Sequence, residues 1–221
     1  MIDALPKIAI RERALFADAT LLGAFFVSGL SALVYQVCWQ RSLYGVIGVD
    51  MDSITIVVSA FMLGIGLGGL LGGWLSDRYA SRRLIIFAAS ESAIAMYGAA
   101  TTVLLPWMGE AMAGAAWGSV EARALTCFGL LVVPTALMGM TLPVLTMAFN
   151  EGRTNIGVSV GTLYFVNALG AALGAILVPT VLLPQFTLSQ SILLAVAGNV
   201  VVAGSAVLVA TLLSPASDAR A

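Results

Sequence analysis

The sequence contains few charges, no histidine and only two cysteines. Only 10% of its 221 residues are charged, against about a quarter in an ordinary soluble domain. The missing histidine removes the commonest metal ligand and the commonest general base. Cys38 and Cys127 form no C-x-x-C pair, and the net charge of −1 comes without a basic patch. We therefore expect no metal, no cofactor, no bound nucleic acid and no catalytic residues.

Long hydrophobic runs dominate the chain instead. Six of them are each long enough to cross a hydrocarbon core of about 30 Å: 19–45, 53–75, 84–108, 124–149, 156–183 and 187–213. This pattern predicts an all-α polytopic membrane protein surrounded by the lipid bilayer. We expect an N-terminal segment over 1–18, a six-helix transmembrane domain over 19–213 and a tail over 214–221.

The ends of the chain bear on its orientation. Residues 9–18 fit either a short amphipathic surface segment or a polar leader. The first run is too long for the core of a signal peptide, so we expect a retained helix. With a cytoplasmic N-terminus, only Arg41 and Arg123 of the ten Lys and Arg residues fall outside. The positive-inside rule therefore places both termini in the cytoplasm.

Residues 61–83, FMLGIGLGGLLGGWLSDRYASRR, raise the question of a nucleotide site. Gly64, Gly66 and Gly69 spell G-x-G-x-x-G, which is the pattern of a dinucleotide-binding loop. That loop follows a strand in a water-accessible unit, whereas these glycines lie within an uncharged apolar run. We reject the nucleotide interpretation.

The glycines have another use. Gly64, Gly68 and Gly72 recur every fourth residue, and Gly170 and Gly174 do so later in the chain. Small residues at this spacing allow close helix packing. The two stripes fall in the middle helices of two three-helix groups, which favours a 3+3 inverted repeat. Helix packing without a repeat remains the alternative.

The end of the same stretch, GWLSDRYASRR, resembles the loop signature of the major facilitator superfamily, roughly G-x-x-x-D-R-x-G-R-R. Gly73, Asp77 and Arg78 match it in register, whereas Ala80 replaces the second glycine and the arginine pair is displaced by one residue. In that superfamily these charges latch the cytoplasmic gate. The resemblance implies such a gate loop here, and a positive-inside loop with one counter-ion is the alternative. The residues concerned are Gly73, Asp77, Arg78, Arg82 and Arg83.

Five segments, in order, resemble the membrane half of the fused major-facilitator/spermidine-synthase-like proteins of bacteria. They are SGLSALVYQVCWQRSLYGVIG, SAFMLGIGLGGLLGGWLSDR, LIIFAASESAIAMYG, PTALMGMTLPVL and GTLYFVNALGAALGAILVPTVLLP. The resemblance covers roughly 25–185 and implies a half-size facilitator bundle in the bacterial inner membrane. Longer members add a soluble aminopropyltransferase-like domain that this sequence lacks, so we do not expect the chain itself to be an enzyme.

Polar side chains within the apolar runs are the candidates for a solute path. Glu91 is the clearest, because an ionisable group at membrane depth is costly. A structural glutamate bonded to a neighbouring helix is the alternative, and Asn199 is expected to join helices by hydrogen bonds. The full set of path candidates is Glu91, Gln36, Gln40, Tyr35, Asn167 and Tyr164.

Two functions remain open. Six helices make half of a twelve-helix facilitator, so the first is transport by a homodimer, with a small cation or amine as a solute suited to Glu91. The second is a non-transporting anchor or scaffold for a larger complex or a separate spermidine-synthase-like enzyme. We prefer the transporter-like half-bundle and expect a homodimer or a separate protein subunit as partner.

Overall fold

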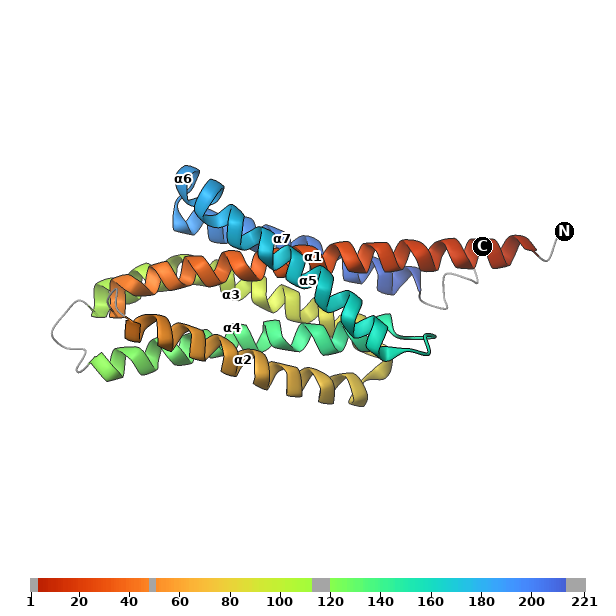
Figure 1. The fold of residues 1–221 in the computed structure, drawn as a ribbon, viewed down its shortest axis with the longest axis horizontal. Helices are drawn as coiled ribbons and strands as arrows, with labels where there is room; N and C mark the ends of the chain where they lie inside the picture. The colour runs from red at the N-terminus through yellow and green to blue at the C-terminus, as the bar shows by residue number, and fades with distance from the viewer. Residues whose placement is uncertain (1–3, 48–50, 113–119, 214–221) are drawn as a thin grey trace.

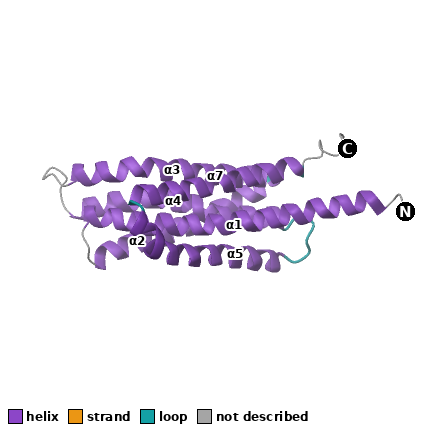
Figure 2. Cartoon of the chain, turned by 90° about the horizontal axis from the view of Figure 1, so that it is seen from above, coloured by secondary structure: helices purple, strands orange, loops and turns teal. Residues whose placement is uncertain are grey.

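The computed structural model describes residues 4–47, 51–112 and 120–213, and this part of the chain is helical. The helices run side by side along the length of the molecule (Figures 1 and 2). Helix α1 begins and α7 ends at the same end of the bundle (Figure 1). The elements are α1 (Ala4–Ile47), α2 (Met51–Arg78), η1 (Ala80–Arg82), α3 (Arg83–Met112), α4 (Val120–Phe149), α5 (Ile156–Leu177), η3 (Val178–Leu182), α6 (Leu183–Gln185) and α7 (Leu188–Leu212).

Six helices of the described chain are long and apolar enough to cross a membrane, as the six hydrophobic runs predicted. Their apolar spans are Glu12–Gly45, Ile54–Arg78, Ala80–Met112, Glu121–Phe149, Ile156–Gln185 and Leu188–Leu212. At 1.5 Å per residue, even the shortest exceeds a hydrocarbon core of about 30 Å.

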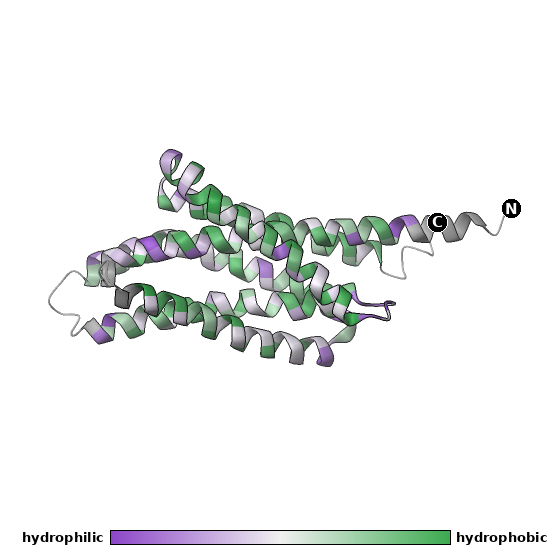
Figure 3. Cartoon of the chain, viewed as in Figure 1, coloured by the Kyte–Doolittle hydropathy of each residue, from purple (hydrophilic) through white to green (hydrophobic). Residues whose placement is uncertain are grey.

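The outward faces of these helices are apolar. Hydrophobic residues cover most of each helix, whereas the turn between α4 and α5 is hydrophilic (Figure 3). Leu70 of α2 is 76% exposed, and Val103 of α3 and Leu125 of α4 are nearly as exposed. A water-soluble monomer rarely carries so much exposed apolar surface. The arrangement therefore fits a hydrocarbon environment.

Glycines lie where helices approach most closely. A Cβ atom added at Gly64, Gly68 or Gly72 of α2 would come within 2.5 Å of an atom of α4. A Cβ at Gly170 or Gly174 of α5 would come within 2.8 Å of the α1 backbone. Small residues are what such close approach requires. The five glycines expected to serve helix packing all lie at these two contacts.

Local sequence explains where several helices begin and end. Gly152 has φ +75°, in the left-handed region that glycine adopts at no steric cost, and it turns the chain between α4 and α5. Asn155 then caps α5 by accepting a hydrogen bond from the Val158 N–H. Thr187 and Gln190 form a reciprocal capping box at the start of α7. Near its end the fifth span contains a π-helix, Val178–Leu182, which includes Pro179 and is followed by α6.

The first helix begins within the N-terminal segment expected over 1–18. Helix α1 is continuous from Ala4 to Ile47. The apolar part of this helix begins at Glu12. Residues 214–221, expected as a tail, lie outside the described residues.

Candidate functional site

Glu91 lies in the middle of the bundle and joins three helices. It is fully buried on α3 and accepts hydrogen bonds from Ser28 Oγ of α1 at 2.7 Å and from Asn199 Nδ2 of α7 at 2.5 Å. Each carboxylate oxygen thus has one donor. Asn199 does form the interhelical hydrogen bond expected from the sequence, and its partner is the carboxylate.

A cavity of about 340 Å³ lies next to this cluster, within the range of small-molecule sites. Ser28 and Asn199 line it, and Glu91 lies directly behind them through the two hydrogen bonds. Its other walls come from α1, α2, α4 and α5, with Ile94 of α3. The lining residues are Phe25, Ser28, Gly29, Ala32, Leu33, Gln36, Phe61, Ile65, Ile94, Met138, Gly139, Thr141, Leu142, Tyr164, Asn167, Ala171 and Asn199.

Three of the six path candidates line this cavity. Gln36 of α1 and Asn167 of α5 are half-buried, and the Asn167 amide donates to the Phe25 carbonyl oxygen at 3.1 Å. Tyr164 is 63% exposed and stands at the cavity's outer edge on α5. With Glu91 behind Ser28 and Asn199, four candidates gather around one space.

The other two path candidates point elsewhere. Tyr35 is buried, stacks on Trp39 with ring centroids 5.0 Å apart and touches the Gly98 position of α3. Gln40 donates to the Tyr44 hydroxyl at 2.6 Å within α1. Neither side chain lines the cavity. They instead belong to the packing of α1.

The expected gate loop is anchored by one arginine. Arg83 donates to the carbonyl oxygens of Ser76 and Met147, at 3.1 and 3.3 Å, and pairs with Glu151 at 3.1 Å. These bonds tie the start of α3 to the ends of α2 and α4. Asp77, Arg78 and Arg82 are exposed, and nothing meets a Cβ placed at Gly73.

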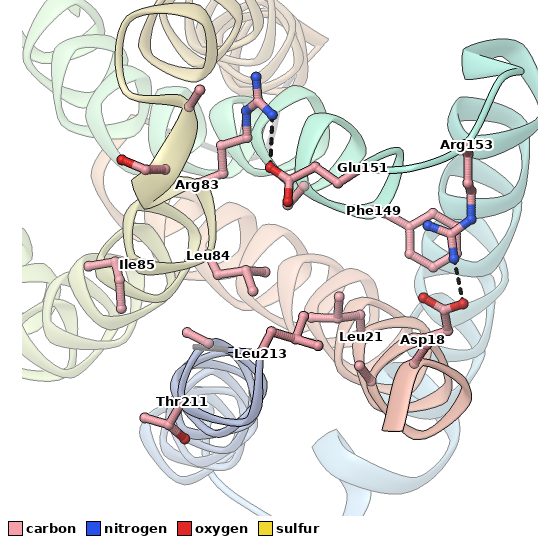
Figure 4. A pocket seen from close by; sticks show the side chains of 16 residues that line it. Asp18, Leu21, Arg83, Leu84, Ile85, Phe149, Glu151, Arg153, Thr211 and Leu213 are labelled. Atoms are coloured by element: carbon pink, nitrogen blue, oxygen red, sulfur yellow. Dashed lines mark hydrogen bonds and ion pairs between the residues drawn. The ribbon is translucent and has the colours of Figure 1, made fainter. Parts of the chain in front are cut away.

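A second ion pair closes the same end of the bundle. Arg153, from the turn between α4 and α5, pairs with Asp18 of α1, and its guanidinium lies 4.0 Å from the centroid of the Phe149 ring. Figure 4 shows both ion pairs at the edge of a pocket of about 710 Å³. The α4–α5 turn thus holds α1 with one charge and α3 with another.

Sequence reasoning missed several of these residues. Ser28 gave no signal, because serine is common in helices and bonds its own backbone. A signal was present for Asp18, Glu151 and Arg153. In a chain with six spans their segments lie at the same end of the bundle, where opposite charges can pair. Among the side chains described over 12–45, 54–112 and 121–213, no group of three His, Cys, Asp or Glu gathers as a metal site would need.

Comparisons with known proteins point to one group of enzymes. The chain is 28% identical over 188 residues to polyamine aminopropyltransferase 1 of Streptomyces coelicolor, covering 82% of this chain. It is 28% identical over 193 residues to polyamine aminopropyltransferase 2 of the same organism, covering 85% of this chain. The chain spans about a third of the length of these curated relatives. No family model and no solved structure matches. What the comparisons support is therefore a distant similarity to spermidine-synthase-like aminopropyltransferases.

Proposed function

We propose that the chain is a half-size membrane transporter whose solute path runs through the cavity beside Glu91 and is completed by a second copy. The observation that carries the proposal is a set of matching helix contacts that favours a repeat, because many secondary transporters are built from inverted repeats with the solute site at the repeat interface. The charge bias described above places both termini in the cytoplasm, and the bacterial inner membrane is the proposed location.

The closest backbone contacts support a repeat. A Cβ at Gly68 or Gly72 would meet the α4 backbone oxygens of Ala136 or Met140 at 1.9 or 2.5 Å. A Cβ at Gly139 of α4 would in turn meet the Ile65 oxygen of α2 at 2.3 Å.

The α1–α5 contact has the same three parts. A Cβ at Gly170 or Gly174 would meet the oxygens of Phe26 or Leu30 at 2.0 or 2.8 Å. A Cβ at Gly29 of α1 would meet the Asn167 oxygen of α5 at 2.2 Å.

Constant differences in residue number relate the two contacts. Adding 110 to the numbers of the three contacting α1 residues gives the three contacting residues of α4. Adding 102 to the numbers of the three contacting α2 residues gives those of α5. Gly64 is an exception, since its counterpart is Val166. Six correspondences with two constants favour a repeat over unrelated helix packing. The pairs are Phe26 and Ala136, Gly29 and Gly139, Leu30 and Met140, Ile65 and Asn167, Gly68 and Gly170, and Gly72 and Gly174.

Helices α3 and α7 extend the pattern. A difference of 108 takes the four α3 residues that line a groove between these helices to four that line it from α7. Those pairs are Ser92 and Val200, Ala95 and Ala203, Met96 and Gly204, and Ala99 and Val207. The same difference relates Glu91 to Asn199, which are hydrogen-bonded to each other. A twofold axis exchanging the two halves would therefore pass between Glu91 and Asn199.

The cavity occupies the position that this axis predicts for a solute site. Four repeat-related pairs line it: Ser28 and Met138, Gly29 and Gly139, Ala32 and Leu142, and Ile65 and Asn167. The side chains differ within each pair except for the glycines, so the two halves contribute unequal chemistry. Polar groups come mainly from α1, α5 and α7.

A second copy would cover the open side of the cavity. Tyr164 and the neighbouring Phe165 are 63% and 65% exposed on α5, at the cavity's edge. In twelve-helix facilitators the solute lies between two six-helix halves. Two copies facing each other through α2 and α5 would reproduce that arrangement.

Cross-linking tests this face. Tyr164→Cys in lipid vesicles should give a disulfide-linked dimer on mild oxidation. The control is Met96→Cys, at a position 74% exposed on α3, which should stay monomeric. The native Cys38 and Cys127 are buried and should not interfere. Equal cross-linking of both variants, or none at Tyr164→Cys, would contradict the proposed dimer.

Flux tests the path. Reconstituted protein should move a small cation or amine across vesicle membranes, and Glu91→Gln should abolish that flux. Glu110→Gln changes an exposed glutamate on the same helix and should leave it intact. Unchanged flux in Glu91→Gln would remove Glu91 from the mechanism.

The similarity to two aminopropyltransferases favours a second candidate. In this alternative the bundle anchors a separate spermidine-synthase-like enzyme and transports nothing. Purification in mild detergent distinguishes the two. A stoichiometric soluble enzyme in the complex supports the anchor, and a pure homodimer supports the transporter.

A further inference from the structure

Three polar side chains of the cavity lining donate hydrogen bonds to other protein groups. Ser28 Oγ and Asn199 Nδ2 both donate to Glu91, and Asn167 Nδ2 donates to the Phe25 carbonyl oxygen. All three residues line the cavity. Each of them keeps an acceptor oxygen, and each of the two amides also keeps one N–H, because an NH₂ group carries two donors.

One of these oxygens is buried and has no partner in the described chain. Asn199 is only 2% exposed, and its Oδ1 has no hydrogen bond among the described residues. Because only the NH₂ group of the amide can donate to the Glu91 carboxylate, the orientation of the amide is fixed by that bond. Buried polar atoms nearly always have a partner. Asn199 Oδ1 therefore lacks a donor, and because almost none of its surface is accessible it is not open to the cavity.

An ionised Glu91 has no protein counter-ion in the described chain. Glu91 accepts from two neutral groups, and both described ion pairs involve other carboxylates. A buried carboxylate with neutral partners attracts a cation. Since Ser28 stands between Glu91 and the cavity, a cation in the cavity would contact the Ser28 hydroxyl oxygen and interact with Glu91 through it.

The shape of the cavity favours an organic cation. Phe61, Ile65 and Leu142 form apolar wall on the sides contributed by α2 and α4. Calcium and magnesium ions are bound mainly through carboxylates, whereas none of the described residues that line this cavity is an Asp or Glu. A primary ammonium group brings three N–H donors and a positive charge, and an alkyl chain suits the apolar wall.

We propose that the cavity binds a primary alkylammonium ion, with its nitrogen at the oxygens of Ser28 and Asn167 and its chain along Phe61, Ile65 and Leu142. The inference rests on the proposed function in taking this cavity as the solute site. It adds the class of solute: a cation with N–H donors and an aliphatic part.

Binding of labelled n-butylammonium to the purified chain in lipid nanodiscs tests the inference. We expect n-butylammonium to bind saturably. Competition by n-butanol, which is neutral, should be at least tenfold weaker than competition by unlabelled n-butylammonium. Tetramethylammonium, which has no N–H group, should not compete. Equal competition by n-butanol would show an apolar pocket without charge selection. The absence of saturable binding would show that the cavity holds water only. Either result overturns the inference.

Two matched variants locate the site. Glu91→Gln should weaken n-butylammonium binding about tenfold or more, as loss of an ionic partner does, and Glu110→Gln should not change it. Equal affinities of these two variants would contradict the proposed site. If Glu91→Gln does not fold, the competition series on the unmodified chain still decides.

The nanodisc assay separates this inference from the transport proposal. A monomeric chain that binds n-butylammonium but carries no flux would sink the half-size transporter and leave the site standing. A dimer that moves other solutes without binding n-butylammonium would overturn the alkylammonium site and leave the half-size transporter standing.

Discussion

Replacing Gly68 by alanine should destabilise the bundle, whereas the same change at Gly66 should not. A Cβ at position 68 would lie 1.9 Å from the Ala136 carbonyl oxygen, 2.7 Å from its carbonyl carbon and 2.9 Å from its Cα. All three are backbone atoms, so no side-chain rotation relieves the clash. A Cβ at position 66 meets nothing within 4 Å.

The size of the effect follows from the geometry. An ordinary contact begins at 3.4 Å, so α2 and α4 would have to separate locally by about 1.5 Å. That separation also loosens the contacts of Gly64 and Gly72 on the same face. Overpacking of this kind costs about 1–3 kcal/mol. At position 66 alanine relieves the helix penalty of glycine, worth up to about 1 kcal/mol.

Unfolding in mixed micelles of mild detergent and SDS measures the difference. We expect the free energy of unfolding to fall by about 1–3 kcal/mol in Gly68→Ala and to stay equal or rise in Gly66→Ala. Gly170→Ala should behave like Gly68→Ala, because its Cβ would lie 2.0 Å from the Phe26 oxygen. If Gly68→Ala proved as stable as Gly66→Ala, the close α2–α4 contact and the repeat built on it would be refuted.

Three further predictions concern the hydrogen bonds and ion pairs. Arg83→Ala should lower the free energy of unfolding by about 1–2 kcal/mol, since it removes hydrogen bonds to two backbone oxygens. Arg82→Ala, at an exposed residue, should leave the free energy of unfolding unchanged. Equal effects of the two variants would contradict the anchoring role of Arg83. Glu151→Ala should cost less than about 0.5 kcal/mol, because exposed ion pairs contribute little, and a loss matching that of Arg83→Ala would show that the pair dominates. Ser28→Ala should lower the free energy of unfolding by about 1–2 kcal/mol, because it leaves Glu91 Oε1 without its donor. Ser205→Ala should change it by less than about 0.5 kcal/mol, because the Ser205 hydroxyl bonds only its own helix. A similar loss in both variants would rule out a special role for Ser28.

The sequence predicts the helices well because a membrane imposes a length and a polarity on each of them. All six apolar spans appear near the expected residues. The beginning of α1 could not be predicted from hydrophobicity. Residues 4–11 include Lys7 and Arg11, which interrupt a hydrophobic run, yet they are part of the helix. The four-residue glycine stripes lie at the α2–α4 and α1–α5 contacts, where close packing leaves few other residue choices.

The site was predictable only in part. Glu91 stands out in any apolar run, but its partners Ser28 and Asn199 come from helices distant in sequence. Gln36 and Gln40 share the polarity that suggested a solute path, yet only Gln36 faces the cavity. Periodicity shows that two residues share a face of a helix, and it cannot show which neighbour that face meets.

Thiol labelling in sealed vesicles tests most directly whether this cavity is a solute site inside a membrane bundle. Reagents of the methanethiosulfonate type react with the thiolate, which forms where water reaches the cysteine. Gln36→Cys, within the first span and lining the cavity, should react with a small cationic reagent. Met96→Cys, on the outer face of α3, should not react. Labelling of Met96→Cys as fast as Gln36→Cys, or protection of Gln36→Cys in every condition, would contradict the account.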